Sequence, residues 1–266
     1  MTQKKPLALI TGASSGIGVE LARVFAREGY DLVLVARRQA ELDTLGDELS
    51  AAYHTHCYVL PCDLTVPGEI EKLVGRLPKR PVDVLLNNAG VMQMKEFAQD
   101  DIQRQLQQIQ LNVLALTELT HRCLKPMLKR GEGRIANLAS VAAFQPVPML
   151  AVYAATKAYV LSFSEALSEE LHGTGVSCTA ICPGFTDTPM LRGHKHPQRK
   201  PPALPLGLIA DPAFVAAQAY EAIMEREVIM VPGLVYKALT TLSRLPPKGL
   251  VRGLVGGVGR YMKKKK

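Results

Sequence analysis

The sequence predicts an α/β fold, a single doubly wound parallel sheet of about seven strands with helices on both faces and a short helical extension. Three observations predict it. Short apolar runs alternate with longer stretches of helical periodicity. The apolar runs are nearly continuous, as expected for strands covered on both faces. The first run also leads directly into a glycine-rich turn.

The composition is that of an ordinary globular protein. Of 266 residues, 47% are hydrophobic and 21% are charged, and the 5 cysteines are widely spaced without a Cys-x-x-Cys pair. These values argue against disorder, a disulfide framework or a metal site, and they indicate a reduced, cytoplasmic setting. The N-terminal apolar run is too short for a signal peptide or a membrane span.

The first apolar run, Leu7 to Ile10, is predicted to be a strand that ends in the glycine-rich turn Thr11 to Gly18. A helix should follow, because Ile17, Leu21 and Phe25 recur at helical spacing. Glycines permit a tight turn and let N–H groups at the helix N-terminus approach a pyrophosphate. A plain tight turn is the alternative. A Walker-type phosphate loop is excluded because the sequence lacks its Gly-Lys-Ser/Thr ending.

Two arginines follow the second predicted strand, Asp31 to Ala36. In dinucleotide-binding sheets an acidic residue about 20 positions beyond the glycine loop holds the ribose, and arginine there accommodates a 2′-phosphate. Here Arg37 and Arg38 occupy that place, so we expect NADP(H) in preference to NAD(H). A solvated arginine pair that opens the next helix is the alternative.

A helix is predicted from Ala40 to Tyr53, and a third strand from Cys57 to Leu60. Asp63 and Leu64 lie just beyond this strand. The Asp63 carboxylate can accept a hydrogen bond from an adenine amino group, or it can cap a helix that begins near Val66.

The fourth predicted strand, Val82 to Leu86, ends in Asn87-Asn88-Ala89-Gly90, where small residues let the chain pass close to a ligand. A long helix is predicted from about Asp101 to Lys129. It should bury one apolar stripe, formed by Leu106, Ile109, Val113 and Leu116.

Asn112 lies next to that stripe, where asparagine is mildly unfavourable in a helix. It is either a tolerated boundary residue or a polar group that serves a bound water or a catalytic lysine.

Ser140 follows the fifth predicted strand, Gly133 to Leu138, and a helix that carries Tyr153 and Lys157 comes next and runs to about His172. Spacing of four residues sets the phenol and the ammonium on one face of a helix. A nearby ammonium lowers a phenol pKa, whereas the alternative is a core tyrosine and a solvated lysine. Ser140 lacks nucleophile-elbow glycines, so hydrogen bonding to a carbonyl suits it better.

The remaining chain continues the alternation. Val176 to Ile181 is the sixth predicted strand, and a donor-rich turn from Pro183 to Pro189 follows it. We expect a mobile loop over the site from Met190 to Pro205, a helix from Pro212 to Arg226 and a seventh strand from Val228 to Val231.

Taken in order, these features resemble the short-chain dehydrogenase/reductase family over Pro6 to Val231. A single motif would be weak evidence, whereas the ordered set is specific. The matching residues are Thr11-Gly12-x-x-x-Gly16-x-Gly18, Asp63, Asn87-Asn88-Ala89-Gly90, Asn112, Ser140, Tyr153-x-x-x-Lys157 and Pro183-Gly184.

The resemblance implies a Rossmann fold and a role for each catalytic residue. Tyr153 would be the general acid/base, and Lys157 would lower its pKa and bind the nicotinamide ribose. Ser140 would orient the carbonyl, and Asn112 would hold a water in the proton relay. The implied cofactor contacts are Gly12, Ser14, Ser15, Gly16, Ile17 and Gly18 at the pyrophosphate, Arg37 and Arg38 at the 2′-phosphate, Asp63 and Leu64 at adenine, Asn88, Ala89 and Gly90 along the cofactor, and Pro183, Gly184 and Thr186 at the nicotinamide.

The implied activity is NADP(H)-dependent interconversion of a carbonyl and a secondary alcohol in a catalytic domain spanning residues 1–231. A fairly apolar small-molecule substrate is expected, because the segment between Ser140 and Tyr153 contains Phe144, Pro146, Val147, Met149 and Leu150. A non-catalytic NADP(H)-binding sensor or scaffold is the alternative. The resemblance also favours a homodimer or homotetramer through the helices near residues 101–129 and 150–172.

Residues 232–266 form a basic, partly apolar extension that resembles a subgroup of bacterial reductases. No acidic residue follows Glu227, whereas nine Lys and Arg residues do, so the net charge of +8 leaves about 8 − 9 = −1 for the first 227 residues. An apolar helix is predicted from Leu234 to Leu245, and Leu250, Leu254 and Val258 recur beyond it.

This pattern suggests peripheral attachment to an anionic surface such as the inner membrane. Packing on the protein body or on a subunit neighbour is the alternative, and vesicle flotation with and without the residues after Leu245 separates the two. Nucleic-acid binding is not expected, because the tail lacks stacking aromatics beyond Tyr236 and Tyr261.

Overall fold

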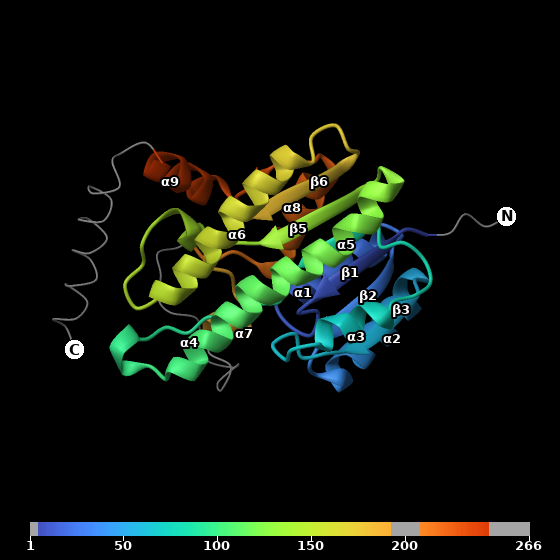
Figure 1. Cartoon of the computed structure of the whole chain (residues 1–266), viewed down its shortest axis with the longest axis horizontal. Helices are drawn as coiled ribbons and strands as arrows, with labels where there is room; N and C mark the ends of the chain where they lie inside the picture. The colour runs from blue at the N-terminus through green and yellow to red at the C-terminus, as the bar shows by residue number, and fades with distance from the viewer. Residues whose placement is uncertain (1–4, 193–207, 245–266) are drawn as a thin grey trace.

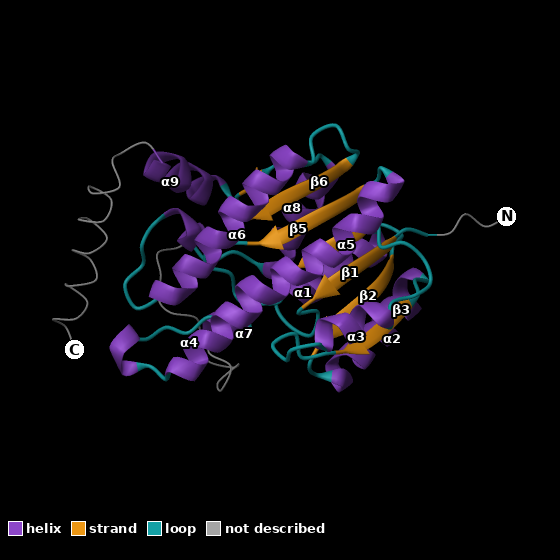
Figure 2. Cartoon of the chain, in the orientation of Figure 1, coloured by secondary structure: helices purple, strands orange, loops and turns teal. Residues whose placement is uncertain are grey.

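The computed structural model describes residues 5–192 and 208–244, and it contains a seven-stranded sheet between two layers of helices (Figures 1 and 2). All paired strands are parallel, in the order β3-β2-β1-β4-β5-β6-β7. The strands are β1 (Leu7–Thr11), β2 (Asp31–Ala36), β3 (Cys57–Pro61), β4 (Val84–Asn87), β5 (Gly133–Leu138), β6 (Val176–Ile181) and β7 (Ile229–Met230). The predicted doubly wound sheet is therefore confirmed.

Helices connect successive strands, and their bounds lie close to the predicted ones. The helices are α1 (Ile17–Arg27), α2 (Gln39–Tyr53), α3 (Glu69–Gly75), α4 (Ile102–Ile109), α5 (Leu116–Arg130), α6 (Ala151–Glu170), α7 (Pro189–Arg192), α8 (Pro212–Met224) and α9 (Leu234–Arg244). Three short turns of other helical types are η1 (Phe97–Gln99), η2 (Gln110–Ala115) and η3 (Val141–Phe144). The strand order reverses between β1 and β4, and parallel sheets bind ligands at such a reversal.

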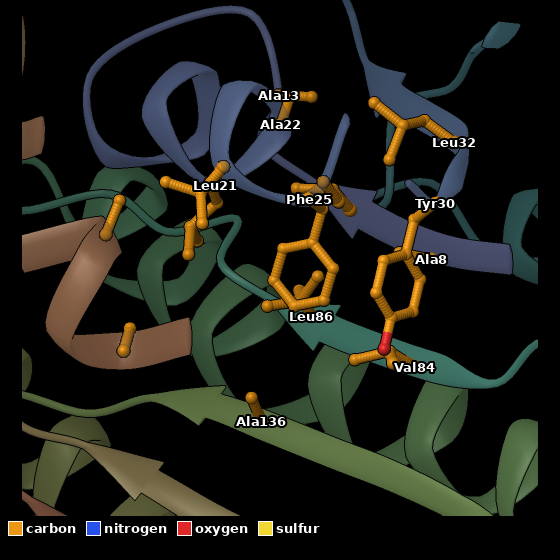
Figure 3. Close-up of a cluster of buried hydrophobic side chains, with 14 of the residues drawn as sticks. Ala8, Ala13, Leu21, Ala22, Phe25, Tyr30, Leu32, Val84, Leu86 and Ala136 are labelled. Carbon is orange, nitrogen blue, oxygen red and sulfur yellow. The ribbon is translucent and has the colours of Figure 1, made fainter. Parts of the chain in front are cut away.

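The helix α1 is held against the sheet by an aromatic cluster around Phe25 (Figure 3). The Phe25 ring is fully buried and makes edge-to-face contacts with Tyr30 at 5.0 Å and with Tyr220 of α8 at 5.1 Å, measured between ring centroids. A second buried cluster fills the opposite face of the sheet, where α3, α5 and α6 pack. Burial on both faces explains why the strands read as continuous apolar runs.

The predicted long helix contains a π-helical segment, η2, between α4 and α5. Its expected apolar stripe is wrong in part, because the Leu106 side chain is 50% exposed and Ile109 is 37% exposed. The buried face instead carries Gln105 and Gln108. The Gln108 side chain accepts a hydrogen bond from the Gln93 N–H at 3.0 Å, so it satisfies the loop that follows β4.

The C-terminal extension is described only up to residue 244. Its helix α9 confirms the helix expected from Leu234 as far as Arg244, and Leu245 lies outside the described residues. The expected repeat at Leu250, Leu254 and Val258 lies outside the described residues. So does most of the expected mobile loop, whose first residues form α7 together with Pro189.

Within residues 5–192 and 208–244, no helix combines the length and the apolar character that a bilayer crossing requires. All five cysteines lie within the described residues and none of them forms a disulfide bond, and four of them are buried.

Candidate active site

The glycine-rich turn between β1 and α1 forms one wall of the site. Gly12 and Gly16 have positive φ values of 69° and 58°, which L side chains rarely adopt. The N-terminus of α1 has no side-chain cap, so its first N–H groups are free to bind an anion. Ser14 and Ser15 lie in this turn, and Ile17 and Gly18 open the helix.

The end of β4 is clamped to this turn. The Asn88 side-chain amide donates to the Thr11 carbonyl at 2.8 Å and to the Gly12 carbonyl at 3.2 Å, and the Thr11 hydroxyl accepts from the Asn88 and Ala89 N–H groups. A β-carbon on Gly12 would lie 2.8 Å from the Asn88 amide nitrogen. Asn88, predicted to line a cofactor, therefore also shapes the turn that would hold it.

The two arginines after β2 behave differently. The Arg38 guanidinium donates to the carbonyl and the hydroxyl of Ser14 at 2.9 and 3.0 Å, and it lies 3.1 Å from the Glu41 carboxylate. The Arg37 side chain is 63% exposed, and its nearest carboxylate, Asp63, lies at 4.0 Å. Arg38 therefore supports the glycine turn, whereas Arg37 is the more available cation.

Asp63 holds a local turn and does not cap α3, which starts at Glu69. Its carboxylate accepts from the Thr65 N–H at 3.0 Å and from the Thr65 hydroxyl at 2.7 Å. Burial opposes ionisation, but these bonds and the charge of Arg37 outweigh it and hold the Asp63 pKa below its usual value. Leu64 is buried beneath this turn, so only its backbone remains for an adenine contact.

Ser140 and Tyr153 meet where β5 ends and α6 begins. The Ser140 side chain caps the turn η3 by accepting from the Ala142 N–H at 3.2 Å, and it donates to the Pro183 carbonyl at 3.4 Å. Burial raises the pKa of the Tyr153 phenol, and a hydrogen bond with the Ser140 side chain lowers it in part. The predicted proximity of these two side chains is confirmed.

Lys157 lies one turn along α6 from Tyr153 and is buried. Its ammonium donates to the Leu138 carbonyl at 2.5 Å and lies 5.8 Å from the centroid of the Tyr153 ring. Burial lowers the pKa of Lys157 to about 8, and the neighbouring Cys182 raises it slightly. Burial of the phenol dominates the Tyr153 pKa in this structure, and the expected lowering of that pKa by Lys157 stays a prediction for the protein with nucleotide bound.

Asn112 lies in the π-helical segment, which turns its side chain toward the loop after β4. Its amide oxygen accepts from the Val91 N–H at 2.9 Å, and its amide nitrogen donates to the Val91 carbonyl and the Thr156 hydroxyl. A β-carbon on Gly90 would lie 3.3 Å from that oxygen and 3.6 Å from the Lys157 ammonium. Gly90 thus lets the asparagine and the lysine approach the same space.

The turn after β6 reaches the glycine turn through a residue that the sequence analysis did not select. A β-carbon on Gly16 would lie 3.0 Å from the Thr188 methyl group, so Thr188 faces the N-terminus of α1. The selected Thr186 is buried, and its hydroxyl donates to the Gly184 carbonyl at 3.1 Å within its own loop. The only feature of the sequence that pointed to Thr188 was the number of hydroxyl groups in the turn from Pro183 to Pro189.

Tyr236 of α9 also reaches this turn. A β-carbon on Gly184 would collide with the Tyr236 ring, and the Tyr236 hydroxyl accepts from the Phe185 N–H at 3.2 Å. This part of the extension is therefore packed on the protein body, as one of the two alternatives for the tail proposed.

These residues fit a dinucleotide. The uncapped start of α1 suits a pyrophosphate, and Arg37 suits a further phosphate. The glycines of the turn before α1 carry no side chains that would keep a ligand away from the backbone. Beyond the end of β5 lie the phenol of Tyr153, the hydroxyl of Ser140 and the ammonium of Lys157, which together can move a proton and bind a carbonyl oxygen. Within the described ranges, no cluster of three or more His, Cys, Asp or Glu side chains could hold a metal.

Comparisons with known proteins agree with this geometry. Residues 6–199 match the family model of short chain dehydrogenases. Sulfoacetaldehyde reductase 2 of Chromohalobacter salexigens is 39% identical over 186 residues, which are 68% of this chain and 73% of that protein.

Two solved structures are similar over nearly the whole chain. A short-chain dehydrogenase from Sphingobium yanoikuyae in complex with NADPH is 34% identical, with a TM-score of 0.80 over 90% of this chain and 94% of its own. A bulky-bulky ketone specific alcohol dehydrogenase from Comamonas testosteroni is 30% identical, with a TM-score of 0.77 over 92% and 96% of the two chains.

The burial of Lys157 predicts a specific pH dependence of folding. In the folded chain Lys157 loses its proton near pH 8, whereas the unfolded lysine keeps it up to a pKa of about 10.4. Between these values the unfolded state binds more protons, so the free energy of unfolding rises with pH. Relative to Lys157→Met, the wild-type protein should gain about 2 kcal/mol between about pH 7.5 and 9.5, at 1.36 kcal/mol per unit.

Urea unfolding of both proteins across this pH range measures the difference. The same substitution at the exposed Lys129 on α5 controls for the loss of a lysine. A wild-type advantage that stays constant or falls as the pH rises contradicts the burial of a titrating ammonium at this position.

Proposed function

The chain belongs to the short-chain dehydrogenase family, and from that premise we propose that it is an NADP(H)-dependent oxidoreductase. It interconverts a carbonyl and a secondary alcohol by hydride transfer, on a fairly apolar small-molecule substrate. The observation that supports this most strongly is that Ser140, Tyr153 and Lys157 are all buried where β5 ends and α6 begins, with the Lys157 ammonium 5.8 Å from the centroid of the Tyr153 ring. A sensor or scaffold on the same fold has no need for that set.

The chain's residues divide the proton chemistry among them. When bound, a reduced nicotinamide supplies the hydride for the carbonyl carbon. Tyr153 donates its proton to the carbonyl oxygen, and the Ser140 hydroxyl donates a hydrogen bond to the same oxygen. Lys157 stabilises the phenolate that remains, and Asn112 holds a water on the path that returns a proton. In the oxidising direction Tyr153 accepts the proton instead.

The preference for NADP(H) rests on Arg37. Its side chain is exposed and only loosely paired with Asp63, so it can turn to a 2′-phosphate without breaking a short ion pair. Arg38 acts beside it by holding Ser14 in the glycine turn. The similar dehydrogenase from Sphingobium yanoikuyae, solved in complex with NADPH, supports the same choice.

The preference for an apolar substrate rests on the surroundings of Tyr153. Met92, Val147 and Leu150 are partly buried and pack against the cluster that contains Tyr153. The similar alcohol dehydrogenase specific for bulky-bulky ketones supports a ketone, whereas sulfoacetaldehyde reductase 2 is named for a charged aldehyde. The apolar lining favours the ketone.

Assembly is proposed through the helices α4, α5 and α6. The outer surface of these helices and of η2, which joins α4 to α5, carries large apolar side chains that are 41–53% exposed, at Ile102, Leu106, Leu114 and Tyr159. Apolar side chains gathered on one helical surface mark an interaction site. A homodimer or homotetramer would cover them.

We also propose that the residues beyond 244 contact a membrane surface, because their sequence combines basic and apolar residues. Flotation of the full chain with anionic vesicles, but not of a chain ending at Leu245, supports this contact. Equal behaviour of the two chains contradicts it.

Tyr153→Phe tests the proposed acid. The substitution removes the proton donor and keeps the ring, so the rate of NADPH oxidation with ketones, aldehydes or 3-oxoacyl thioesters should fall by roughly 10²–10⁴-fold. NADPH affinity, measured by fluorescence titration, should change less than about twofold because the phosphate contacts remain. Turnover at the wild-type rate rules out the role of Tyr153, and a wild-type protein inert on all three classes supports the scaffold.

Arg37→Ala tests the cofactor preference. A charge-assisted hydrogen bond is worth about 1.5–3 kcal/mol, so the dissociation constant for NADPH should rise roughly 10–100-fold. The constant for NADH should hardly change, since NADH lacks the phosphate. Arg27→Ala removes an exposed arginine that pairs with Glu28 on the same chain and is the matched control. Equal losses for both nucleotides, or none for NADPH, contradict the assignment.

Leu106→Glu tests the assembly surface. A carboxylate in an apolar interface cannot be paired and costs several kcal/mol, so light scattering should show a smaller particle for the variant than for the wild type. Val66→Glu, at another exposed apolar position, should leave the mass unchanged. The proposed interface is wrong if the Leu106 variant keeps the wild-type mass.

A further inference from the structure

The helix α9 lies against the residues that carry the active-site serine. It packs on η3, the turn that follows Ser140. Figure 1 shows α9 at the end of the molecule toward which the arrows of β5 and β6 point. An element of the C-terminal extension therefore lies beside η3, and its Tyr236 side chain contacts the turn after β6.

Tyr236 holds the turn after β6 in two ways. Its ring covers Gly184 so closely that no side chain could replace the glycine hydrogen. Its hydroxyl accepts a hydrogen bond from the Phe185 N–H at 3.2 Å and donates one to the Leu208 carbonyl at 2.7 Å. One phenol thus satisfies a donor and an acceptor that are 23 residues apart in the chain.

Phe185 and Leu208 lie on two segments that also bond to each other directly. Next to them, the Ala210 N–H donates to the Phe185 carbonyl at 2.8 Å, and the Asp187 N–H donates to the Ala210 carbonyl at 3.0 Å. The Tyr236 hydroxyl adds a side-chain bridge at the end of this short ladder. It therefore links the backbone at Phe185 to the backbone at Leu208.

A short path connects this bridge to the catalytic pair. The Pro183 carbonyl, one residue before Gly184, accepts from the Val141 N–H at 3.0 Å and from the Ser140 hydroxyl at 3.4 Å. The turn η3, which Ser140 caps, packs on α6, and the Ser140 hydroxyl lies near enough to Tyr153 to lower the pKa of its phenol. Movement of Pro183 and Gly184 would change the direction of the Ser140 hydroxyl.

We propose that Tyr236 is a positioning residue for the active site. By holding Gly184 and Phe185, it fixes the Pro183 carbonyl and thereby aims the Ser140 hydroxyl at Tyr153 and at the substrate oxygen. A glycine in the turn gives the backbone freedom that must be removed from outside, and the phenol of α9 removes it. The kinetic part of this inference rests on the proposed function, whereas its structural part does not.

Kinetics of Tyr236→Phe and Tyr236→Ala in the full chain test the kinetic part. Tyr236→Phe loses the two hydrogen bonds of the hydroxyl, which should lower kcat for ketone reduction roughly fivefold. Tyr236→Ala, which also loses the ring contact with Gly184, should lose more. The dissociation constant for NADPH should stay within about twofold. Tyr220→Phe removes a phenol hydroxyl from α8, away from the site, and should behave as wild type.

The pH profile separates positioning from a general loss of stability. Alcohol oxidation needs the deprotonated phenol, and the hydrogen bond with Ser140 lowers the phenol pKa. When Ser140 is misdirected, the acidic limb of kcat/KM for alcohol oxidation should move to higher pH. Tyr236→Phe should therefore shift the limb in the same direction as Ser140→Ala, whereas a merely structural change would leave it in place.

Hydrogen exchange tests the structural part without turnover. In Tyr236→Phe, exchange should speed up at the Phe185 amide and also at the Val141 amide, which donates to Pro183. Faster exchange confined to α9, or an unmoved pH limb with wild-type kcat, overturns the proposal. If the wild type turns over no carbonyl but exchange at Val141 still responds, the proposed function fails and the link from Tyr236 to the turn stands.

Discussion

The proton chemistry of the candidate active site depends on the buried ammonium of Lys157. Lys157 is held by the carbonyl at the end of β5, in surroundings that lower its pKa to about 8. The same burial raises the pKa of Tyr153, so the phenol keeps its proton. Such a pair is poised to give a proton away, and it needs a further positive charge nearby before it can readily take one. A cationic nicotinamide next to Tyr153 would supply that charge in the oxidising direction.

Much of the fold could be predicted from the sequence, because buried parallel strands are continuous apolar runs with sharp ends. The bounds of β2, β5 and β6 agree with the predicted ones residue for residue. The helix from α4 to α5 agrees less well. Its buried face carries Gln105 and Gln108, and these are buried because loop N–H and side-chain groups lie opposite them. Periodicity of apolar residues cannot reveal a buried face that is polar.

The candidate site divides in the same way. Residues whose spacing is local, such as Tyr153 and Lys157 on one helix, were found from the sequence. Thr188 and Tyr236 were not, because each meets a glycine far away in the chain, Gly16 and Gly184 respectively. The burial that raises the Tyr153 pKa could not be predicted either, since it depends on packing by residues from several elements. Contacts of this kind follow only from the fold.

Titration of Tyr153 tests the central claim most directly. Carbon-13 labelling of the tyrosine rings, with Tyr153→Phe to assign the signal, allows the phenol pKa to be followed by NMR. Before nucleotide is added, Tyr153 should titrate above the ordinary value of about 10, and saturating NADP⁺ should lower its pKa. A Tyr153 that titrates below about 10 on its own, or that does not respond to NADP⁺, would contradict a buried phenol whose acidity depends on the bound nicotinamide.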